Sequence, residues 1–279
     1  MINQLRITVL ADNCVSAPGL LAEHGLCFLI EADGRRILFD TGQGRVLRDN
    51  LSALGISLHP LDALVLSHGH YDHTGGLPAV AADTTPGAVF FHPSALEQRF
   101  ARGGRPPFRA IGIPERSRDV LQGWSGRAVW TRNATEIVPG VWCTGEIPRY
   151  REENEGEAPF SLDQDGLRPD PLADDQALFI ETKQGLVIVV GCAHAGVANT
   201  VDHVCRLAGR DRIYALAGGL HLGKASHKRL EETGNALGRR GFQCLAPCHC
   251  TGMQGHAYLR CRFHSLVRDL GAGSSLQLA

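Results

Sequence analysis

Three histidines and an aspartate follow one another closely, directly after a short apolar run at residues 63–66. The four side chains are those of His68, His70, Asp72 and His73. Imidazole nitrogens and carboxylate oxygens are ligands for borderline metals such as zinc. Residues two apart in extended backbone point the same way, so His68 and His70 can share one ion. The chain then turns, which lets Asp72 and His73 face a second position. The spacing favours a metal loop over a polar surface loop.

Three later apolar segments also end in small residues followed by histidine. In chain order they supply Cys192, His194, His221 and His249. Binding side chains in sheets of this kind gather at one edge, where the strands end. We therefore expect these residues to meet the first cluster in space.

The cysteines among them are open to two other interpretations. The pattern Cys-x-His-x-Cys around His249 can be half of a closed zinc site completed by Cys244 or Cys261, although such sites normally use paired cysteines on both sides. Cys192 can be a nucleophile with His194 as its base. Against this, residues two apart on a strand lie alongside each other rather than in contact.

Composition indicates an ordinary globular protein, with 43% hydrophobic and 20% charged residues among 279. The net charge of −1 gives no electrostatic basis for binding nucleic acid or a membrane. The sequence has no apolar run long enough to span a bilayer and no signal peptide at its start, so we expect a cytoplasmic protein. Its nine cysteines are scattered and odd in number, which argues against a disulfide framework. A small molecule is the expected partner, and a homo-oligomer is left open.

The elements that must position these residues alternate between strands and helices. Strands are expected at residues 5–10, 26–32, 36–39, 63–66, 88–92, 127–131, 136–143, 177–181, 186–190, 212–217 and 242–246. Helices are expected at residues 44–55, 93–102, 196–208, 226–240 and 253–270, with another beginning near Thr74. Mixed strands with helices outside them predict two packed sheets flanked by helices, a four-layer αββα sandwich.

Two segments interrupt this alternation. Residues 103–118 form an arginine-rich loop, either a solvated surface or a basic flap that meets an anionic substrate. Residues 149–175 carry nine acidic side chains and several prolines, and a loop this long inside a compact domain is usually a lid or insertion. Because alternation resumes directly afterwards, residues 1–279 are predicted to form a single domain.

The motifs EHG, FDTGQG, SHGHYDHTGGL, DDQALFI, GCAHAGVANT, GGLHL and PCHCTG occur in this order. The pattern His-x-His-x-Asp-His resembles the signature of the metallo-β-lactamase superfamily. The whole series resembles one branch of it, the metal-dependent hydrolases similar to 7,8-dihydropterin-6-methyl-4-(β-D-ribofuranosyl)aminobenzene-5′-phosphate synthase. The resemblance implies the αββα fold and a metal site. It also implies that Asp40, in FDTG, supports the metal-loop histidines.

One departure from the superfamily pattern concerns the late ligands. The pair Gly191-Cys192 stands where the superfamily usually has Gly-Asp, and Asp174-Asp175 stands where a histidine is expected. We prefer His194 as the late ligand of the first ion and His249 as that of the second. Cys192 or Asp175 can substitute for the missing group.

The expected protein is therefore a hydrolase or transferase of a phosphorylated small molecule, using one or two zinc ions, with Mn, Fe or Mg as alternatives. His68, His70 and His194 are predicted to hold one ion, and Asp72, His73 and His249 the other. Asp72 is also expected to orient a water or take up its proton, and His221 to be a proton donor or phosphate ligand. His24 is a further residue for the rim of the site. Another hydrolysis (phosphodiester, thioester or lactone) and a non-catalytic metal-binding regulator are the competing functions.

Overall fold

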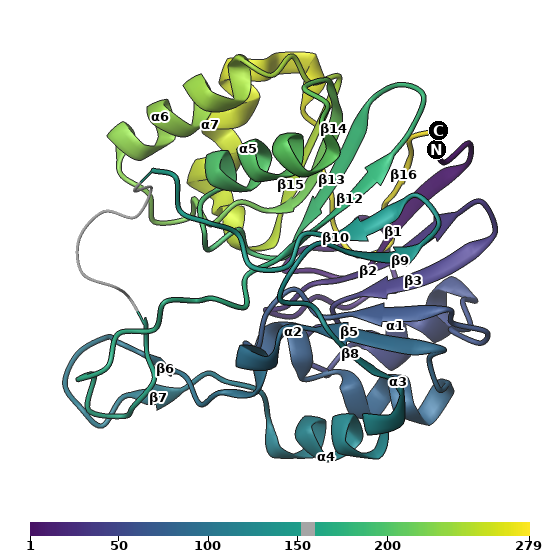
Figure 1. Ribbon diagram of the computed structural model, residues 1–279, viewed down its shortest axis with the longest axis vertical. Helices are drawn as coiled ribbons and strands as arrows, with labels where there is room; N and C mark the ends of the chain where they lie inside the picture. The colour runs from purple at the N-terminus through teal and green to yellow at the C-terminus, as the bar shows by residue number, and fades with distance from the viewer. Residues whose placement is uncertain (152–159) are drawn as a thin grey trace.

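The computed structural model describes residues 1–151 and 160–279, and two β-sheets packed face to face form its centre (Figure 1). The first sheet contains, in spatial order, β16 (Ser275–Gln277), β1 (Leu5–Ala11), β2 (Cys27–Ala32), β3 (Arg35–Phe39), β4 (Ala63–Val65), β5 (Ala88–Phe91) and β8 (Ala128–Trp130). The second contains β15 (Cys244–Cys248), β14 (Ile213–Gly219), β13 (Leu186–Val190), β12 (Ala177–Glu181), β10 (Val141–Cys143) and β9 (Thr135–Val138).

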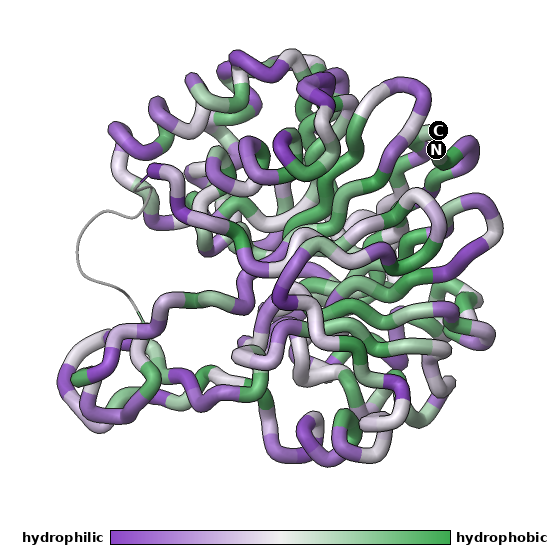
Figure 2. Tube along the Cα trace, viewed as in Figure 1, coloured by the Kyte–Doolittle hydropathy of each residue, from purple (hydrophilic) through white to green (hydrophobic). Residues whose placement is uncertain are grey.

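Helices cover the outer face of each sheet (Figure 1). The first sheet is covered by α1 (Leu47–Leu54), α3 (Leu77–Asp83) and α4 (Glu115–Gly123), and the second by α5 (Val197–Ala208), α6 (His227–Gly238) and α7 (Gly252–Phe263). Alternation along β2 shows how the sequence makes these layers. Phe28 and Ile30 enter the core between the sheets, whereas Leu29 packs under the helices on the other side. Figure 2 shows the apolar residues concentrated along the central strands. The predicted αββα sandwich is confirmed.

The direction of the strands gathers the chemistry at one edge. β3 and β4 run parallel in the first sheet, and β13, β14 and β15 run parallel in the second. Parallel neighbours end on the same side, and ligands in α/β sheets bind outside the carboxyl ends of the strands. Five of the motifs lie at the carboxyl ends of these five strands: FDTGQG, SHGHYDHTGGL, GCAHAGVANT, GGLHL and PCHCTG.

Several local predictions were wrong. The helix expected at residues 93–102 is only a 3₁₀ turn, Pro93–Leu96, and the chain is already extended at Glu97 before β6 (Phe100–Ala101). The strand expected at residues 136–143 is a hairpin of β9 and β10, turned at Gly140 with φ 81°. The last helix ends at Phe263, and the strand β16 was not predicted. α4 begins inside the segment expected to be a loop.

The insertion joins a small third sheet beside the sandwich. β11 (Phe160–Ser161) pairs with β6, which pairs with β7 (Arg109–Ala110), so residues from both interrupting segments meet. Residues 152–159 of the expected lid lie outside the described residues. The helices in the described part of the chain are all too short or too polar to cross a bilayer.

Candidate metal centre

The loop after β4 carries the first ligand cluster and is held in shape by Asp40 at the end of β3. The Asp40 carboxylate accepts hydrogen bonds from the Ser67 backbone N–H and hydroxyl, both at 2.7 Å, and contacts His73 Nδ1 at 2.7 Å. Ser67 Oγ in turn lies 2.8 Å from His68 Nδ1. Asp40 is fully buried and adopts a left-handed backbone conformation, φ 60°. It therefore fixes the orientation of two metal-loop imidazoles at once, the role that the family resemblance implies.

Glycine at position 191 is required for this support. A Cβ atom there would lie 2.1 Å from Ser67 Oγ and 3.0 Å from Asp40 Oδ2. The chain leaving β13 can therefore approach the metal loop only because Gly191, the residue before Cys192, has no side chain. The Gly-Cys pair found in the sequence brings the sulfur into the site through this close approach.

The three histidines expected to hold one ion lie together. His68 Nε2 is 3.0 Å from His70 Nδ1, and the rings of His68 and His194 are 4.8 Å apart between centroids. The Nε2 atoms of His70 and His194 are buried without a hydrogen-bond partner. Buried polar atoms of a native protein are normally satisfied. These two nitrogens point to a ligand that satisfies them.

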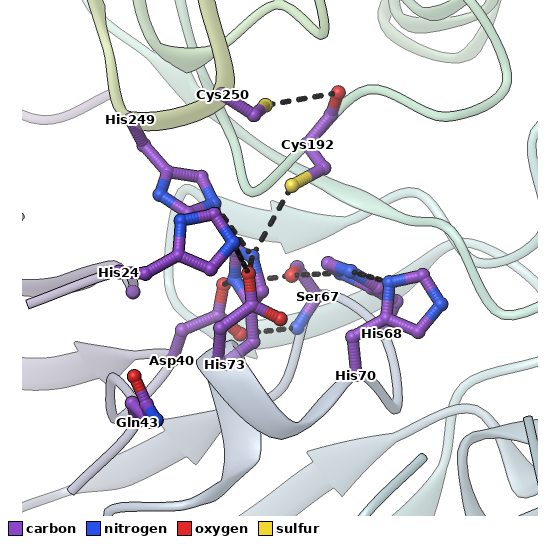
Figure 3. Close-up of polar contacts among 12 residues, drawn as sticks. His24, Asp40, Gln43, Ser67, His68, His70, His73, Cys192, His249 and Cys250 are labelled. Carbon is purple, nitrogen blue, oxygen red and sulfur yellow. Dashed lines mark hydrogen bonds and ion pairs between the residues drawn. The ribbon is translucent and has the colours of Figure 1, made fainter. Parts of the chain in front are cut away.

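The second expected set also meets. His73 Nε2 lies 3.2 Å from His249 Nε2, and Asp72 Oδ2 lies 3.5 Å from the same nitrogen of His249 and 3.9 Å from that of His73. The rim residue His24 reaches in as well, with Nε2 3.2 Å from Asp72 Oδ2. Residues separated by up to 225 positions in the chain thus face one small volume, as Figure 3 shows for the labelled histidines.

Cys192 lies between the two sets (Figure 3). Its sulfur is 3.2 Å from His73 Nε2. Ligand atoms of His68, Cys192 and His194 lie within 4.8 Å of one another, and so do those of His73, Cys192 and His249. Cys192 is therefore placed to contact both positions.

The other ligands that the sequence left open have different surroundings. The Asp175 carboxylate accepts a hydrogen bond from the Ala195 backbone N–H at 2.7 Å. Among residues 1–151 and 160–279, the groups of ligand atoms close enough to share an ion contain none of Asp175, Cys244 and Cys261. His70 is outside these groups too, but its Nδ1 lies 3.0 Å from His68 Nε2, which keeps it in the first set. Of the alternatives, Cys192 is the one that the geometry favours.

The electrostatics keep most of these imidazoles neutral. Burial lowers the pKa of His70 to about 3 and that of His249 to about 4, and it also lowers the pKa values of His68 and His194. Neutral imidazole is the form that binds metal. His73 is the exception: burial lowers its pKa, but the carboxylates of Asp40 and Asp72 outweigh burial and raise it to about 9. The positive charge of His73 compensates the charges of the two neighbouring carboxylates, as a bound metal ion would.

Some residues of the site were not found from the sequence. Asn13 Oδ1 lies 2.8 Å from His249 Nδ1, and Asp12 Oδ1 accepts from the His249 backbone N–H at 2.9 Å. Both follow β1, so a polar pair directly after a strand was the available signal. Phe160 was also missed; its ring lies 4.9 Å from that of His70 and 5.4 Å from that of His194. It covers these histidines from the side of the insertion.

A cavity of about 130 Å³ opens onto the centre. Its lining includes Asp72, Cys192, His221, His249, Cys250 and Arg109. Arg109, on β7, places its guanidinium 5.4 Å from the centre of the Tyr71 ring. Arg105 is exposed and does not line the cavity. The basic segment therefore contributes one arginine to the site through Arg109.

Comparison with known proteins agrees with this geometry. A model of the metallo-beta-lactamase superfamily matches residues 21–198. The chain belongs to this superfamily. It is 31% identical over 267 residues to 7,8-dihydropterin-6-methyl-4-(beta-D-ribofuranosyl)-aminobenzene-5'-phosphate synthase of Methanocaldococcus jannaschii, covering 92% of this chain and 90% of the relative. The branch expected from the motifs is thereby confirmed.

Solved structures of the superfamily share the fold. One, a metal-dependent hydrolase of the beta-lactamase superfamily, is 30% identical and superposes with a TM-score of 0.81 over 99% of both chains. Zinc-bound PqqB from Methylobacterium extorquens is 14% identical, with a TM-score of 0.54 over 97% of this chain and 99% of its own, a likeness of fold alone. Metallo-β-lactamase-fold proteins of this superfamily bind metal ions, and the histidine, cysteine and aspartate groups of this chain provide places for them.

Proposed function

We propose that the protein is a zinc-dependent enzyme that hydrolyses a phosphorylated small molecule or transfers a group from it. The observation that carries the proposal is the pair of ligand groups that meet at Cys192, one with His68 and His194 and the other with His73 and His249. Two adjoining groups support a centre for two ions. Nitrogen, sulfur and carboxylate donors together suit zinc better than magnesium or calcium, which prefer oxygen.

The residues present fit such a centre. We propose His68, His70 and His194 for one ion and Asp72, His73 and His249 for the other, with Cys192 between them. The unpartnered Nε2 of His194 and the 3.0 Å separation between His68 Nε2 and His70 Nδ1 support the first assignment. When bound, zinc supplies Lewis acidity and lowers the pKa of water enough to provide hydroxide near neutral pH.

Two side chains of the protein, Asp72 and His221, are proposed to interact with the attacking water and the substrate. Burial raises the pKa of Asp72, but the charges of His73 and neighbouring imidazoles outweigh burial and hold it well below its usual range. Asp72 therefore stays ionised, and we propose that its Oδ2 orients the attacking water by accepting a hydrogen bond from it. His221 lines the same cavity, and we propose that one of its ring nitrogens donates a hydrogen bond to the substrate phosphate.

The substrate class is supported by the cations at the cavity. Arg109, from β7, and His24 both line the cavity. Hydrogen bonding to Asp72 raises the pKa of His24, which favours its positive form. A guanidinium can hold a phosphate through two parallel hydrogen bonds. The product named for the M. jannaschii relative also carries a phosphate, so the synthesis of that product is the first reaction to be tested here.

A panel of substrates tests the proposal. The zinc-loaded protein is assayed for the synthase reaction, and beside it on bis-p-nitrophenyl phosphate, a thioester and a lactone. Turnover of a phosphorylated substrate that is lost in Asp72→Asn supports the proposal. Turnover of only the thioester or lactone points to another hydrolysis. No turnover of any substrate by fully metal-loaded protein points to a metal-binding regulator.

A further inference from the structure

Two cysteines and a histidine form a further group beside the histidine-rich centre. Ligand atoms of Cys192, His221 and Cys250 lie within 4.8 Å of one another. His221 and Cys250 belong to neither of the two histidine groups described above. Figure 3 shows the Cys250 side chain beside Cys192, on the side of Cys192 away from His68 and His70. The chemistry of this group differs from that of its neighbours, because two of its three donors are sulfur.

The backbone is shaped to bring these atoms together. The His221 backbone N–H donates to Cys250 Sγ at 3.3 Å, and Cys250 Sγ lies 3.8 Å from the carbonyl oxygen of Cys192. His221 adopts φ 50°, a left-handed conformation that is costly for a residue other than glycine. A Cβ atom on Gly219 would lie 2.6 Å from Cys250 Sγ. The end of β14 therefore lacks a side chain at the one position where it would displace the sulfur.

The dimensions and surroundings suit a metal ion. With zinc–sulfur bonds of about 2.3 Å and tetrahedral angles, two sulfurs lie roughly 3.8 Å apart, so atoms already within 4.8 Å need only small side-chain movements. His221 Nδ1 is buried without a hydrogen-bond partner. Thiolate is the form that binds metal, and metal binding itself favours loss of the thiol proton.

We propose that Cys192, His221 and Cys250 form an additional binding position for a thiophilic divalent ion such as zinc, next to the histidine-rich centre. Three protein ligands of this kind leave a fourth coordination position open, as in catalytic rather than structural zinc sites. The group borders the cavity, so the open position faces the space where substrate is proposed to bind. An imidazole has two ring nitrogens, so His221 can hold the ion through one and donate to substrate through the other.

The additional position can be tested separately from the histidine-rich centre, because two of its ligands belong to it alone. A thiolate can contact two ions, so Cys192 can serve this position together with one of the neighbouring positions. Cys250 and His221 serve this one alone. Removing either should change the metal content and leave the histidine ligands in place. The proposal is therefore tested independently of the proposed enzymatic function, because its test measures metal binding and not turnover.

Cobalt(II) and zinc titrations of the full-length protein, with a phosphine reductant to prevent disulfide formation, test the proposal. Cobalt bound to thiolate gives an intense charge-transfer absorption in the near ultraviolet. In Cys250→Ser we expect about half of this absorption, since one of two thiolates remains, and one fewer zinc per chain by native mass spectrometry. Cys261→Ser is the matched control, because Cys261 is exposed on α7 and joins no ligand group of the described chain. It should match the wild type in both measurements.

A second variant guards against a folding effect of the serine. His221→Asn keeps both thiols and should weaken zinc binding at this position at least tenfold. Wild-type absorption and zinc content in Cys250→Ser, or unchanged zinc affinity in His221→Asn, would overturn the proposal. Loss of the absorption in Cys192→Ser but not in Cys250→Ser would also overturn it and leave Cys192 as a ligand of the histidine groups only.

Discussion

The Asp40 carboxylate touches His73 Nδ1 at 2.7 Å with the same oxygen that accepts the Ser67 hydroxyl, also at 2.7 Å. One buried carboxylate thereby aligns an imidazole of the second ligand set and, through Ser67, the His68 imidazole of the first. Groups that hold ligands in this way are worth about 10- to 100-fold in metal affinity. The order of the metal loop thus depends on a residue that contacts no proposed ion.

Asp40→Asn tests this dependence. Asparagine tolerates the left-handed backbone at position 40, so the loop can keep its path while losing the charge. We expect zinc affinity to fall about 10- to 100-fold, measured by competition with a chromophoric chelator. Asp49→Asn is the control, because Asp49 is an exposed residue of α1. Equal affinity in Asp40→Asn and wild type would contradict the supporting role.

Arg99 ties the segment before β6 to the insertion. Its guanidinium is buried, contacts both oxygens of Asp174 at 2.6 Å and also contacts Asp170 at 2.7 Å. Asp174 also accepts from the Gly69 backbone N–H, between two metal-loop histidines, at 2.7 Å. Arg99→Met should lower the free energy of unfolding by about 3–5 kcal/mol, because it leaves two buried carboxylates without their cation.

Urea denaturation measures this loss, and Arg35→Met is its control. The Arg35–Asp62 pair is separated by the same order of distance, 2.8 Å, but the Arg35 side chain is 60% exposed. Exposed pairs contribute at most about 1 kcal/mol. Similar losses in the two variants would show that burial of the Arg99 ion pairs is not what stabilises this region.

Arg109 is expected to bind the substrate phosphate. Its replacement by alanine should raise KM for a phosphorylated substrate about tenfold or more with a smaller change in kcat, since a hydrogen bond to a charged group is worth about 1.5–3 kcal/mol. Arg105→Ala removes an exposed arginine of the same segment that does not line the cavity and should leave KM unchanged. Equal KM values in Arg109→Ala and wild type would exclude this contact.

Metal removal should destabilise the protein. The unpartnered, buried nitrogens of His70 and His194 are satisfied only when a ligand is present. At free zinc about 100 times above the Kd, binding adds about 2.7 kcal/mol to the free energy of unfolding. Calorimetry before and after chelation measures the loss as a fall in Tm that added zinc reverses. A Tm independent of zinc would contradict a site in the folded state.

The sequence predicted the sandwich and most of its strands because burial on both faces leaves long apolar runs, as in β13. It also placed His194, His221 and His249 at strand ends, and the structure brings all three to one edge. It could not choose between Cys192 and Asp175, since either can supply the missing ligand and only the close approach at Gly191 places Cys192 in the site. The extended course of the chain around Arg99 was missed because its ion partners lie more than seventy residues away.

The central claim is that the two ligand sets, far apart in sequence, form one metal centre. Zinc content per chain is measured for wild type, His70→Ala and His249→Ala after identical loading and removal of free metal. The account predicts that each variant loses zinc relative to wild type, His70→Ala from the set with His68 and His194 and His249→Ala from the set with Asp72 and His73. Full wild-type zinc content in both variants would contradict it.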